Sequence, residues 1–169
     1  MKKIFFSLLV MLGCIGSSVA QEKSTYITGF DTQLSLYGGS GLKPAELGFD
    51  FGYNFTDWFY GAVRFEESIA LFEIDGVRSY ALNEVMGGVA GFNLLKSGVG
   101  VLTLKVSAGG TSRKRSDWKY AFYSGGVYFN IGKTAWRPVL GCGVRYYDSR
   151  SRGVDNYLRF YCSFGFRLN

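Results

Sequence analysis

The last 13 residues, YLRFYCSFGFRLN, alternate between apolar and polar or small side chains. The even positions are apolar without interruption: Leu158, Phe160, Cys162, Phe164, Phe166 and Leu168. A period of two residues is typical of a β-strand with one apolar and one polar face. In a water-soluble protein the apolar face would point inward, whereas in a barrel that crosses a membrane it would point outward. The remaining sequence has to distinguish these two orientations.

Residues 1–20 have the three parts of a secretory signal peptide. They combine a positively charged start with two lysines, an apolar stretch over residues 4–15 and a small-residue cleavage site at Ala20. We therefore expect residues 21–169 to form one exported domain. The alternative is a lipoprotein signal with an acylated Cys14, which the cleaner cleavage site at Ala20 disfavours.

The composition favours an all-β protein, because 24 Gly, 15 Phe and 12 Tyr accompany only 2 Pro and no long helical pattern is present. Alternating runs separated by turn residues predict eight strands, at 26–37, 46–55, 58–67, 83–94, 99–109, 119–131, 135–147 and 156–168. The sixth run is ambiguous, because Tyr and Phe fall on both of its faces. These strands and their connections account for nearly the whole exported domain.

Two turn signals predict the register of the first strands. A turn centred on Asp57 places Asp50 directly opposite Arg64 on the next strand. The dipeptide Asp75-Gly76 is a strong hairpin signal, and a turn there pairs apolar with apolar residues across the hairpin. In both cases residues of the same face meet, so the two registers agree with the alternation.

The residue types on the two faces indicate which one is inside. The polar faces carry Gly, Ser, Asn, Tyr and a few charges, with Lys105 as their one lysine, whereas a soluble barrel would present Lys, Glu and Thr to water. The apolar faces are continuous Phe, Leu and Val, as contact with lipid requires. We therefore expect an all-β, eight-stranded, antiparallel up-and-down transmembrane β-barrel. A soluble lipocalin-like binder is the alternative.

Aromatic residues near the strand ends support this expectation, because aromatic side chains gather at the two boundaries of a bilayer. We expect one aromatic girdle from Tyr53, Phe55, Trp58 and Trp136. We expect the other from Tyr37, Trp118, Tyr120, Tyr146 and Tyr157.

With these features the chain resembles the small outer-membrane barrels of the OmpA and OmpX kind over residues 24–169. Its final strand, Tyr161–Asn169, is similar to the outer-membrane assembly signal, although the chain continues beyond Phe166 where that signal commonly ends in Phe. The resemblance implies an integral protein of the Gram-negative outer membrane. Its implied partners are outer-membrane lipid, lipopolysaccharide and the barrel-assembly machinery, the last through the C-terminal strand. Function varies among such barrels, so the resemblance implies little about it.

Charged residues on the polar faces form a candidate lumen network. Its members are Asp31, Asp50, Arg64, Glu66, Lys105, Arg145, Arg159 and Arg167. An eight-stranded barrel is just wide enough for side chains to fill, and an unpaired buried charge is costly. We therefore expect a plug of mutually neutralised charges. The alternative is a porin-like narrow pore for ions or small solutes, which hydrated rather than paired charges would favour.

Enzymatic, metal-binding and nucleic-acid-binding functions find little support. The chain has no histidine, so nothing carries over from similar barrels that act as lipid acyltransferases or deacylases. Neither a base with a nucleophile nor a set of metal ligands is recognisable, and we expect no cofactor. The formal net charge of +6 comes without a basic run that contains interleaved aromatics, so no nucleic-acid groove is expected. A lipid-modifying enzyme remains a disfavoured alternative.

The segment SIALFEIDGVRSYAL, residues 68–82, keeps strand alternation beyond the expected membrane boundary. It predicts a hairpin over residues 67–83 that protrudes from the cell surface, and exposed apolar residues there would need a cover. The candidate partner-binding residues are Leu71, Phe72, Ile74, Asp75, Gly76, Val77 and Tyr80. A partner protein could bind by adding a strand.

Basic residues near the outward loops form a second candidate contact. They are Arg113, Lys114, Arg115, Lys119, Arg150 and Arg152, and they would lie near lipopolysaccharide phosphates. The alternative is an ordinary solvated rim. Two cysteines, Cys142 and Cys162, fall opposite each other on the lipid-facing side if the last loop is centred near residue 152, either as a disulfide or as two thiols. Together these features favour a non-enzymatic barrel with a structural or interaction role.

Overall fold

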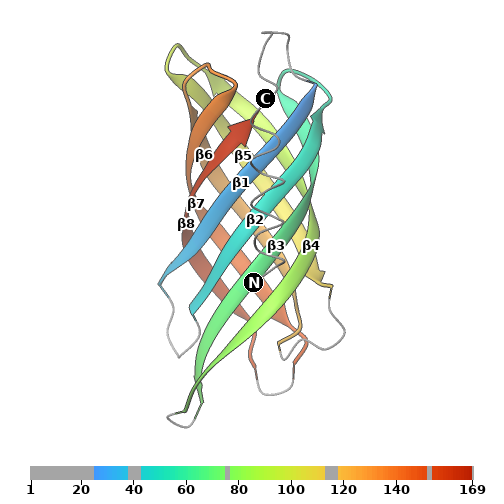
Figure 1. Ribbon diagram of the computed structural model, residues 1–169, viewed down its shortest axis with the longest axis vertical. Coiled ribbons are helices and arrows are strands. Elements are labelled where there is room, and N and C mark those ends of the chain that lie inside the picture. Colours follow the sequence, from blue (N-terminus) through green and yellow to red (C-terminus); the bar gives the residue numbers. More distant parts are fainter. Residues whose placement is uncertain (1–24, 38–42, 75–76, 113–117, 152–153, 169) are drawn as a thin grey trace, which may run out of the picture.

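The computed structural model describes residues 25–37, 43–74, 77–112, 118–151 and 154–168 (Figure 1), and within these only the backbone of residues 36, 37, 43, 70–74, 77–79 and 81. The described residues form eight strands: β1 Tyr26–Tyr37, β2 Lys43–Asn54, β3 Phe59–Ile74, β4 Val77–Lys96, β5 Gly100–Thr111, β6 Tyr120–Ile131, β7 Trp136–Ser149 and β8 Tyr157–Leu168. Among the described residues there is no helix that is long and apolar enough to span a membrane.

Each strand pairs antiparallel with its neighbours in sequence, and β1 also pairs with β8, which closes the sheet into a barrel. The predicted fold class, an all-β, eight-stranded, antiparallel up-and-down barrel, is confirmed in this respect. The largest difference from the predicted strands is in length. Strands β3 and β4 have 16 and 20 residues, whereas β1 and β2 have 12 each.

The predicted registers are confirmed as well. Asp50 pairs with Arg64 across β2 and β3, and the β3–β4 ladder continues in one register from Phe59 to Ile74. Cys142 pairs with Cys162 across β7 and β8. A slip of one residue would turn every side chain of a strand to the opposite face, so the alternation of apolar residues specifies the register strongly.

The β2–β3, β4–β5 and β6–β7 connections, each of three or four residues, lie at one end of the barrel, which we call the short-turn end, and the other four connections lie at the opposite end (Figure 1). In the β2–β3 turn, the backbone N–H of Phe59 donates to Thr56 Oγ1 at 3.0 Å. In the β6–β7 turn, Gly132 has a φ of 87°, a conformation that favours glycine because it lacks a Cβ atom. These turns allow adjacent strands to pair up to their ends.

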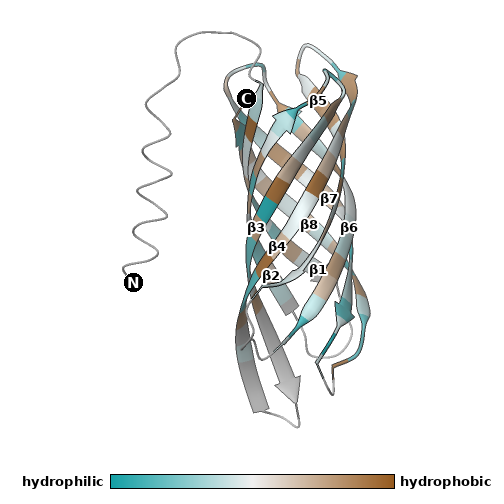
Figure 2. Cartoon of the chain, turned by 90° about the vertical axis from the view of Figure 1, so that its right-hand side faces the viewer, coloured by the Kyte–Doolittle hydropathy of each residue, from teal (hydrophilic) through white to brown (hydrophobic). Residues whose placement is uncertain are grey.

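The apolar faces of the strands form the outer wall of the barrel. Large apolar residues such as Phe51, Val63, Phe65, Leu140, Phe160 and Phe164 are exposed on it. Figure 2 shows the alternation of hydrophobic and hydrophilic residues along the strands. In β6, whose two faces the sequence did not distinguish, Tyr123 and Val127 point outward, whereas Phe122 and Tyr128 are buried inside. The interior therefore holds the polar faces, together with a set of aromatic rings.

One of the two predicted aromatic girdles is partly wrong. At the short-turn end Tyr53, Phe55, Trp58 and Trp136 are exposed, as expected. At the opposite end Tyr146 is exposed, but Trp118 and Tyr120 are each only 1% exposed and lie inside the barrel. Tyr157 is half-buried and packs against them, while the Tyr37 side chain lies outside the described residues. The even-numbered positions of β6 face inward, and Trp118 continues that parity beyond the start of the strand.

Candidate functional site

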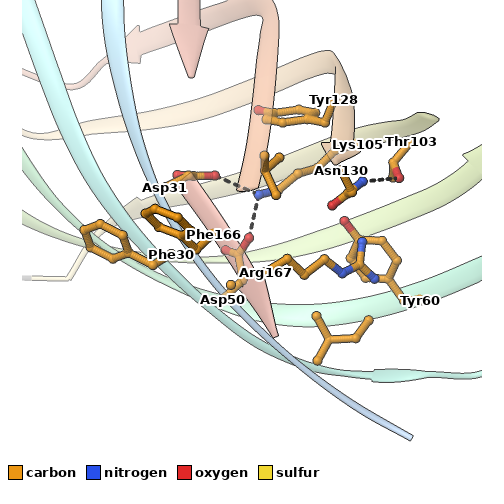
Figure 3. A pocket seen from close by; sticks show the side chains of 13 residues that line it. Phe30, Asp31, Asp50, Tyr60, Thr103, Lys105, Tyr128, Asn130, Phe166 and Arg167 are labelled. Atoms are coloured by element: carbon orange, nitrogen blue, oxygen red, sulfur yellow. Dashed lines mark hydrogen bonds and ion pairs between the residues drawn. The ribbon is translucent and has the colours of Figure 1, made fainter. Parts of the chain in front are cut away.

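The centre of the barrel holds Arg64 of β3 among three carboxylates. Its Nη2 donates to Asp31 Oδ1 at 2.5 Å, its Nη1 to Asp50 Oδ1 at 2.9 Å and its Nε to Glu66 Oε2 at 2.9 Å. Lys105 Nζ, from β5, donates to Asp31 Oδ2 at 3.0 Å and to Asp50 Oδ2 at 2.5 Å. Figure 3 shows this ammonium group between the two aspartates. The chain thus brings one cluster together from strands β1, β2, β3 and β5.

A second cluster forms around Arg145 of β7. Its Nη1 donates to Glu66 Oε2 at 2.9 Å and to Gln33 Oε1 at 3.3 Å, and its Nη2 donates to Glu66 Oε1. The guanidinium carbon lies 3.8 Å from the centroid of the Phe122 ring. Because Glu66 accepts hydrogen bonds from both Arg64 and Arg145, it joins the two clusters.

The joined clusters contain equal numbers of opposite charges. Three carboxylates, those of Asp31, Asp50 and Glu66, are paired with three cations, those of Arg64, Lys105 and Arg145. All six residues are less than 9% exposed. A buried charge is costly unless it is paired and hydrogen-bonded, so the pairing compensates for burial. We call these six residues the ion-pair layer.

The other two predicted lumen charges, those of Arg159 and Arg167, lie against aromatic rings. The Arg167 guanidinium carbon is 4.2 Å from the centroid of the Tyr60 ring, and that of Arg159 is 5.0 Å from the Tyr157 ring. Both arginines are buried. The structure therefore places all eight predicted charges inside the barrel and joins six of them into one network. Glu46, which the sequence reasoning did not include, is also buried and accepts a hydrogen bond from the Tyr147 hydroxyl.

An aromatic cluster fills the barrel at the end opposite the short-turn end. Trp118 lies 4.2 Å from Tyr120, 5.6 Å from Tyr147 and 6.0 Å from Tyr157, measured between ring centroids. Val85 and Phe122 complete the cluster. Sequence reasoning assigned Trp118 and Tyr120 to the outer wall. The small and polar residues Ser124 and Gly126 share their parity, and this signal could have placed them inside.

Towards the short-turn end the lumen contains a small cavity lined by both apolar and charged residues. Its volume is about 30 Å³, and its lining includes Asp31, Asp50, Tyr60, Lys105 and Arg167 (Figure 3). A volume of this size holds roughly one or two water molecules. The charges on its wall are engaged in the contacts described above, so the cavity borders the ion-pair layer.

Glycines on the two faces of the wall have different surroundings. A Cβ atom at Gly48 would lie 2.0 Å from Arg64 Nη2, and one at Gly91 would lie 2.0 Å from the Tyr60 ring. Both glycines face the interior. At the outward-facing Gly88 a Cβ atom would meet nothing within 4 Å. The inward glycines therefore provide the space that the large luminal side chains occupy.

The predicted hairpin is described by its backbone. Strands β3 and β4 pair as far as Ile74 with Val77, and the Tyr80 side chain is 67% exposed. The Asp75-Gly76 dipeptide lies outside the described residues, as do the side chains of Leu71, Phe72, Ile74 and Val77. The structure thus describes the ladder of the hairpin up to the residues next to its tip.

Two of the six predicted basic contacts are described. Lys119 and Arg150 are both exposed, and the backbone N–H of Arg150 donates to the Lys119 carbonyl at 2.7 Å, which brings the two residues together. The remaining four, Arg113, Lys114, Arg115 and Arg152, lie outside the described residues.

Cys142 and Cys162 are exposed on the outer wall and are not bonded to each other in this structure. The described part of the chain contains no group of three or more Cys, Asp or Glu residues placed to hold a metal ion. Comparison of the chain with protein families, with curated proteins and with solved structures finds no match.

Proposed function

We propose that the chain is an integral outer-membrane β-barrel without enzymatic activity, whose barrel is a scaffold that presents the β3–β4 hairpin to a partner. The observation that carries this proposal is the inverted polarity of the barrel. Its outer wall exposes apolar and aromatic side chains, and its interior holds buried ion pairs. A soluble barrel has the opposite arrangement.

Lipid is the medium that suits such a wall. A large contiguous apolar surface is rare on soluble proteins, whereas an apolar outer band is general in barrels that cross a membrane. The strands of 12 residues are long enough, because a tilted membrane-spanning strand needs about 9–11 residues. Export by the predicted signal peptide would deliver the chain to the outer membrane.

The interior supports a scaffold rather than a pore. A pore for ions or solutes requires hydrated charges along an open path, but the six charges of the ion-pair layer bond to one another. The aromatic cluster around Trp118 fills the lumen between that layer and the end opposite the short turns. We therefore expect no steady conductance when the purified protein is inserted into a planar bilayer. A steady conductance would favour the pore instead.

The β3–β4 hairpin supports an interaction role. These two strands extend beyond the others at one end of the barrel (Figure 1). Pairing of β2 with β3 ends at Leu71, and pairing of β4 with β5 begins at Val85. Among the described strand pairings, residues 72–74 and 77–79 therefore pair only with each other. A two-stranded ribbon is marginally stable alone, and its edges can accept a strand from a partner protein.

Lipopolysaccharide is the second candidate partner. The exposed Lys119 and Arg150 lie next to the start of β6 and the end of β7, at the same end of the barrel as the β3–β4 connection. Ammonium and guanidinium groups form charge-assisted hydrogen bonds with phosphates. Replacing both residues with alanine separates this contact from one made by the hairpin.

The first test is extraction of the tagged protein from native outer membranes in a gentle detergent, followed by sizing and mass spectrometry of what accompanies it. A stoichiometric protein that is lost when residues 71–80 are replaced by a short turn would support an accessory subunit. Bound lipopolysaccharide that is lost with Lys119→Ala and Arg150→Ala would support the lipid partner.

The matched control replaces residues 113–117, in another connection at the same end, with a Gly/Ser segment of equal length. This variant should keep a hairpin-dependent protein partner. Because it also removes Arg113, Lys114 and Arg115, it is a control for the protein arm of the test alone. A wild-type protein that is extracted as a bare monomer would contradict the interaction role.

A further inference from the structure

Two cysteines occupy one register position on neighbouring strands. Cys142 of β7 pairs directly with Cys162 of β8, and both side chains are exposed on the apolar outer wall. The pairs on either side, Leu140 with Phe164 and Val144 with Phe160, continue the same register. The third cysteine of the chain, Cys14, lies within the predicted signal peptide.

The ladder places the two residues within reach of a covalent bond. Directly opposed residues of antiparallel strands have Cα atoms about 4.5–5.5 Å apart, and a disulfide spans Cα separations of about 4.4–6.8 Å. Both side chains point to the same side of the sheet, because opposed residues always do. The Cα separation expected for this pair is therefore compatible with a disulfide.

We propose that Cys142 and Cys162 form a cross-strand disulfide in the exported protein. This inference rests on the proposed export, because disulfides form and persist outside the reducing cytoplasm. Once the predicted signal peptide with Cys14 is removed, Cys142 and Cys162 are the two cysteines of the sequence that could bond to each other. The bond would covalently fix β7 to β8.

The bond forms by thiol–disulfide exchange with a protein disulfide or a small disulfide as the oxidant. One cysteine thiolate attacks the disulfide of the oxidant, forms a mixed disulfide and releases one thiol. The thiolate of the other cysteine then attacks the mixed disulfide, forms the Cys142–Cys162 bond and releases the second thiol. The two cysteine sulfurs are oxidised, and the two sulfurs of the oxidant take up both electrons and both protons.

The position of the pair indicates when this reaction takes place. The reacting species is a thiolate, and an ion is costly to form in an apolar medium. Once the wall faces lipid, both cysteines lie within that medium, so we expect oxidation to be faster before insertion than after it. The bond then closes a loop over residues 143–161 and keeps β7 and β8 from pairing one residue out of register, which would turn the apolar face inward.

The first experiment determines the state of the thiols in cells. Cells are lysed directly into denaturant with N-ethylmaleimide, and the tagged chain is analysed by intact mass. The disulfide predicts no adduct and a mass that is two hydrogen atoms below that of the reduced chain. The same protein reduced before alkylation should carry two adducts, which shows that the reagent reaches both thiols. Two adducts without reduction would overturn the inference.

The second experiment tests the geometry in the folded barrel. The reduced protein is folded in detergent and treated with copper-phenanthroline, and a matched variant carries Cys162→Ser with Phe164→Cys. This variant places the second thiol diagonally opposite Cys142, at a Cα separation of about 7–8 Å. The wild type should oxidise at least about tenfold faster, because the diagonal pair exceeds the span of a disulfide. Equal rates would overturn the inference.

Fractionation of the same cells distinguishes failure of the proposed location from failure of the disulfide. Recovery of the protein outside the outer membrane would contradict the proposed location, and the oxidation rates in detergent would still test the cysteine geometry. Recovery in the outer membrane with two alkylated thiols would contradict the disulfide alone.

Discussion

At the scale of single residues, the luminal arginines and the glycines that face them depend on each other. Arg64 reaches three carboxylates because Gly48, on the neighbouring strand, has no side chain. The guanidinium cannot move away without breaking ion pairs, since the residue is 1% exposed and held on several sides. The glycine therefore matters for the space that it leaves.

We predict that Gly48→Ala lowers the free energy of unfolding by about 1–3 kcal/mol, because the added methyl group overlaps the Arg64 guanidinium. The measurement is urea-induced unfolding in detergent, followed by tryptophan fluorescence. Gly88→Ala is the control, since nothing lies within 4 Å of its added Cβ atom. It should leave the stability unchanged or raise it by about 0.5–1 kcal/mol, as alanine orders more easily than glycine. Equal losses in both variants would contradict the prediction.

Arg64→Met should destabilise the barrel more strongly. The substitution keeps a long side chain but leaves Asp31, Asp50 and Glu66 with only the cations of Lys105 and Arg145. Removing one partner from a buried ion pair typically costs about 3–5 kcal/mol, and the same urea unfolding measures it.

The control for this substitution is Lys133→Met, which removes a positive charge from an exposed position in the β6–β7 turn. An exposed substitution of this kind should change the free energy of unfolding by less than about 0.5 kcal/mol. If Arg64→Met also changed the free energy of unfolding by less than about 0.5 kcal/mol, the ion-pair layer would contribute little to stability.

At the scale of strands and turns, the alternation predicts an element well where its two faces differ clearly. Strand β8 has one apolar face and one polar face, and its orientation follows directly. Strand β6 carries aromatic residues on both faces, and the period alone does not distinguish them. Its even positions face inward because Ser107 of β5 pairs with Ser124, and their hydroxyl oxygens lie 2.6 Å apart in the lumen. This pairing turns Trp118 and Tyr120 into the barrel.

We expect Trp118→Ala to destabilise the protein by about 3–5 kcal/mol, the cost of removing a large buried aromatic side chain. Trp118 is 1% exposed and contacts three other rings, whereas Trp58 is 59% exposed at the short-turn end. Trp58→Ala is therefore the matched control and should cause a clearly smaller loss in thermal or urea unfolding. If the two alanine variants lost equal stability, the aromatic cluster would not be a core of the barrel.

At the scale of the whole molecule, the barrel has its charges inside and its apolar residues outside. The six paired charges of the interior come from five strands, and the exposed apolar residues are spread over the outer wall. Lipid around the wall would cover this apolar surface, and the ion-pair layer would be shielded from lipid and from bulk water. This arrangement is the basis of the proposed location.

The three tryptophans of the chain provide a test of that location. In vesicles of brominated lipid, single-tryptophan variants that retain Trp58 or Trp136 should be strongly quenched, because both side chains are exposed on the outer wall. The variant that retains Trp118 should be quenched weakly, because that ring is buried inside the barrel. Replacement of the other two tryptophans by phenylalanine preserves an aromatic ring at each site. Equal quenching of all three variants, or none in any, would contradict a membrane-spanning barrel.

The sequence by itself determined the number of strands, the direction of the apolar faces and the pairing of Asp50 with Arg64 and of Cys142 with Cys162. These features depend on local alternation and on the position of a turn, both of which are present in a short stretch of chain. The tertiary structure alone decided that Arg64 is shared by three carboxylates, that Glu66 joins it to Arg145 and that Trp118 fills one end of the lumen. Such contacts depend on closure of the barrel. Closure brings side chains from strands far apart in the sequence to the same level of the lumen, which is just wide enough for them to fill.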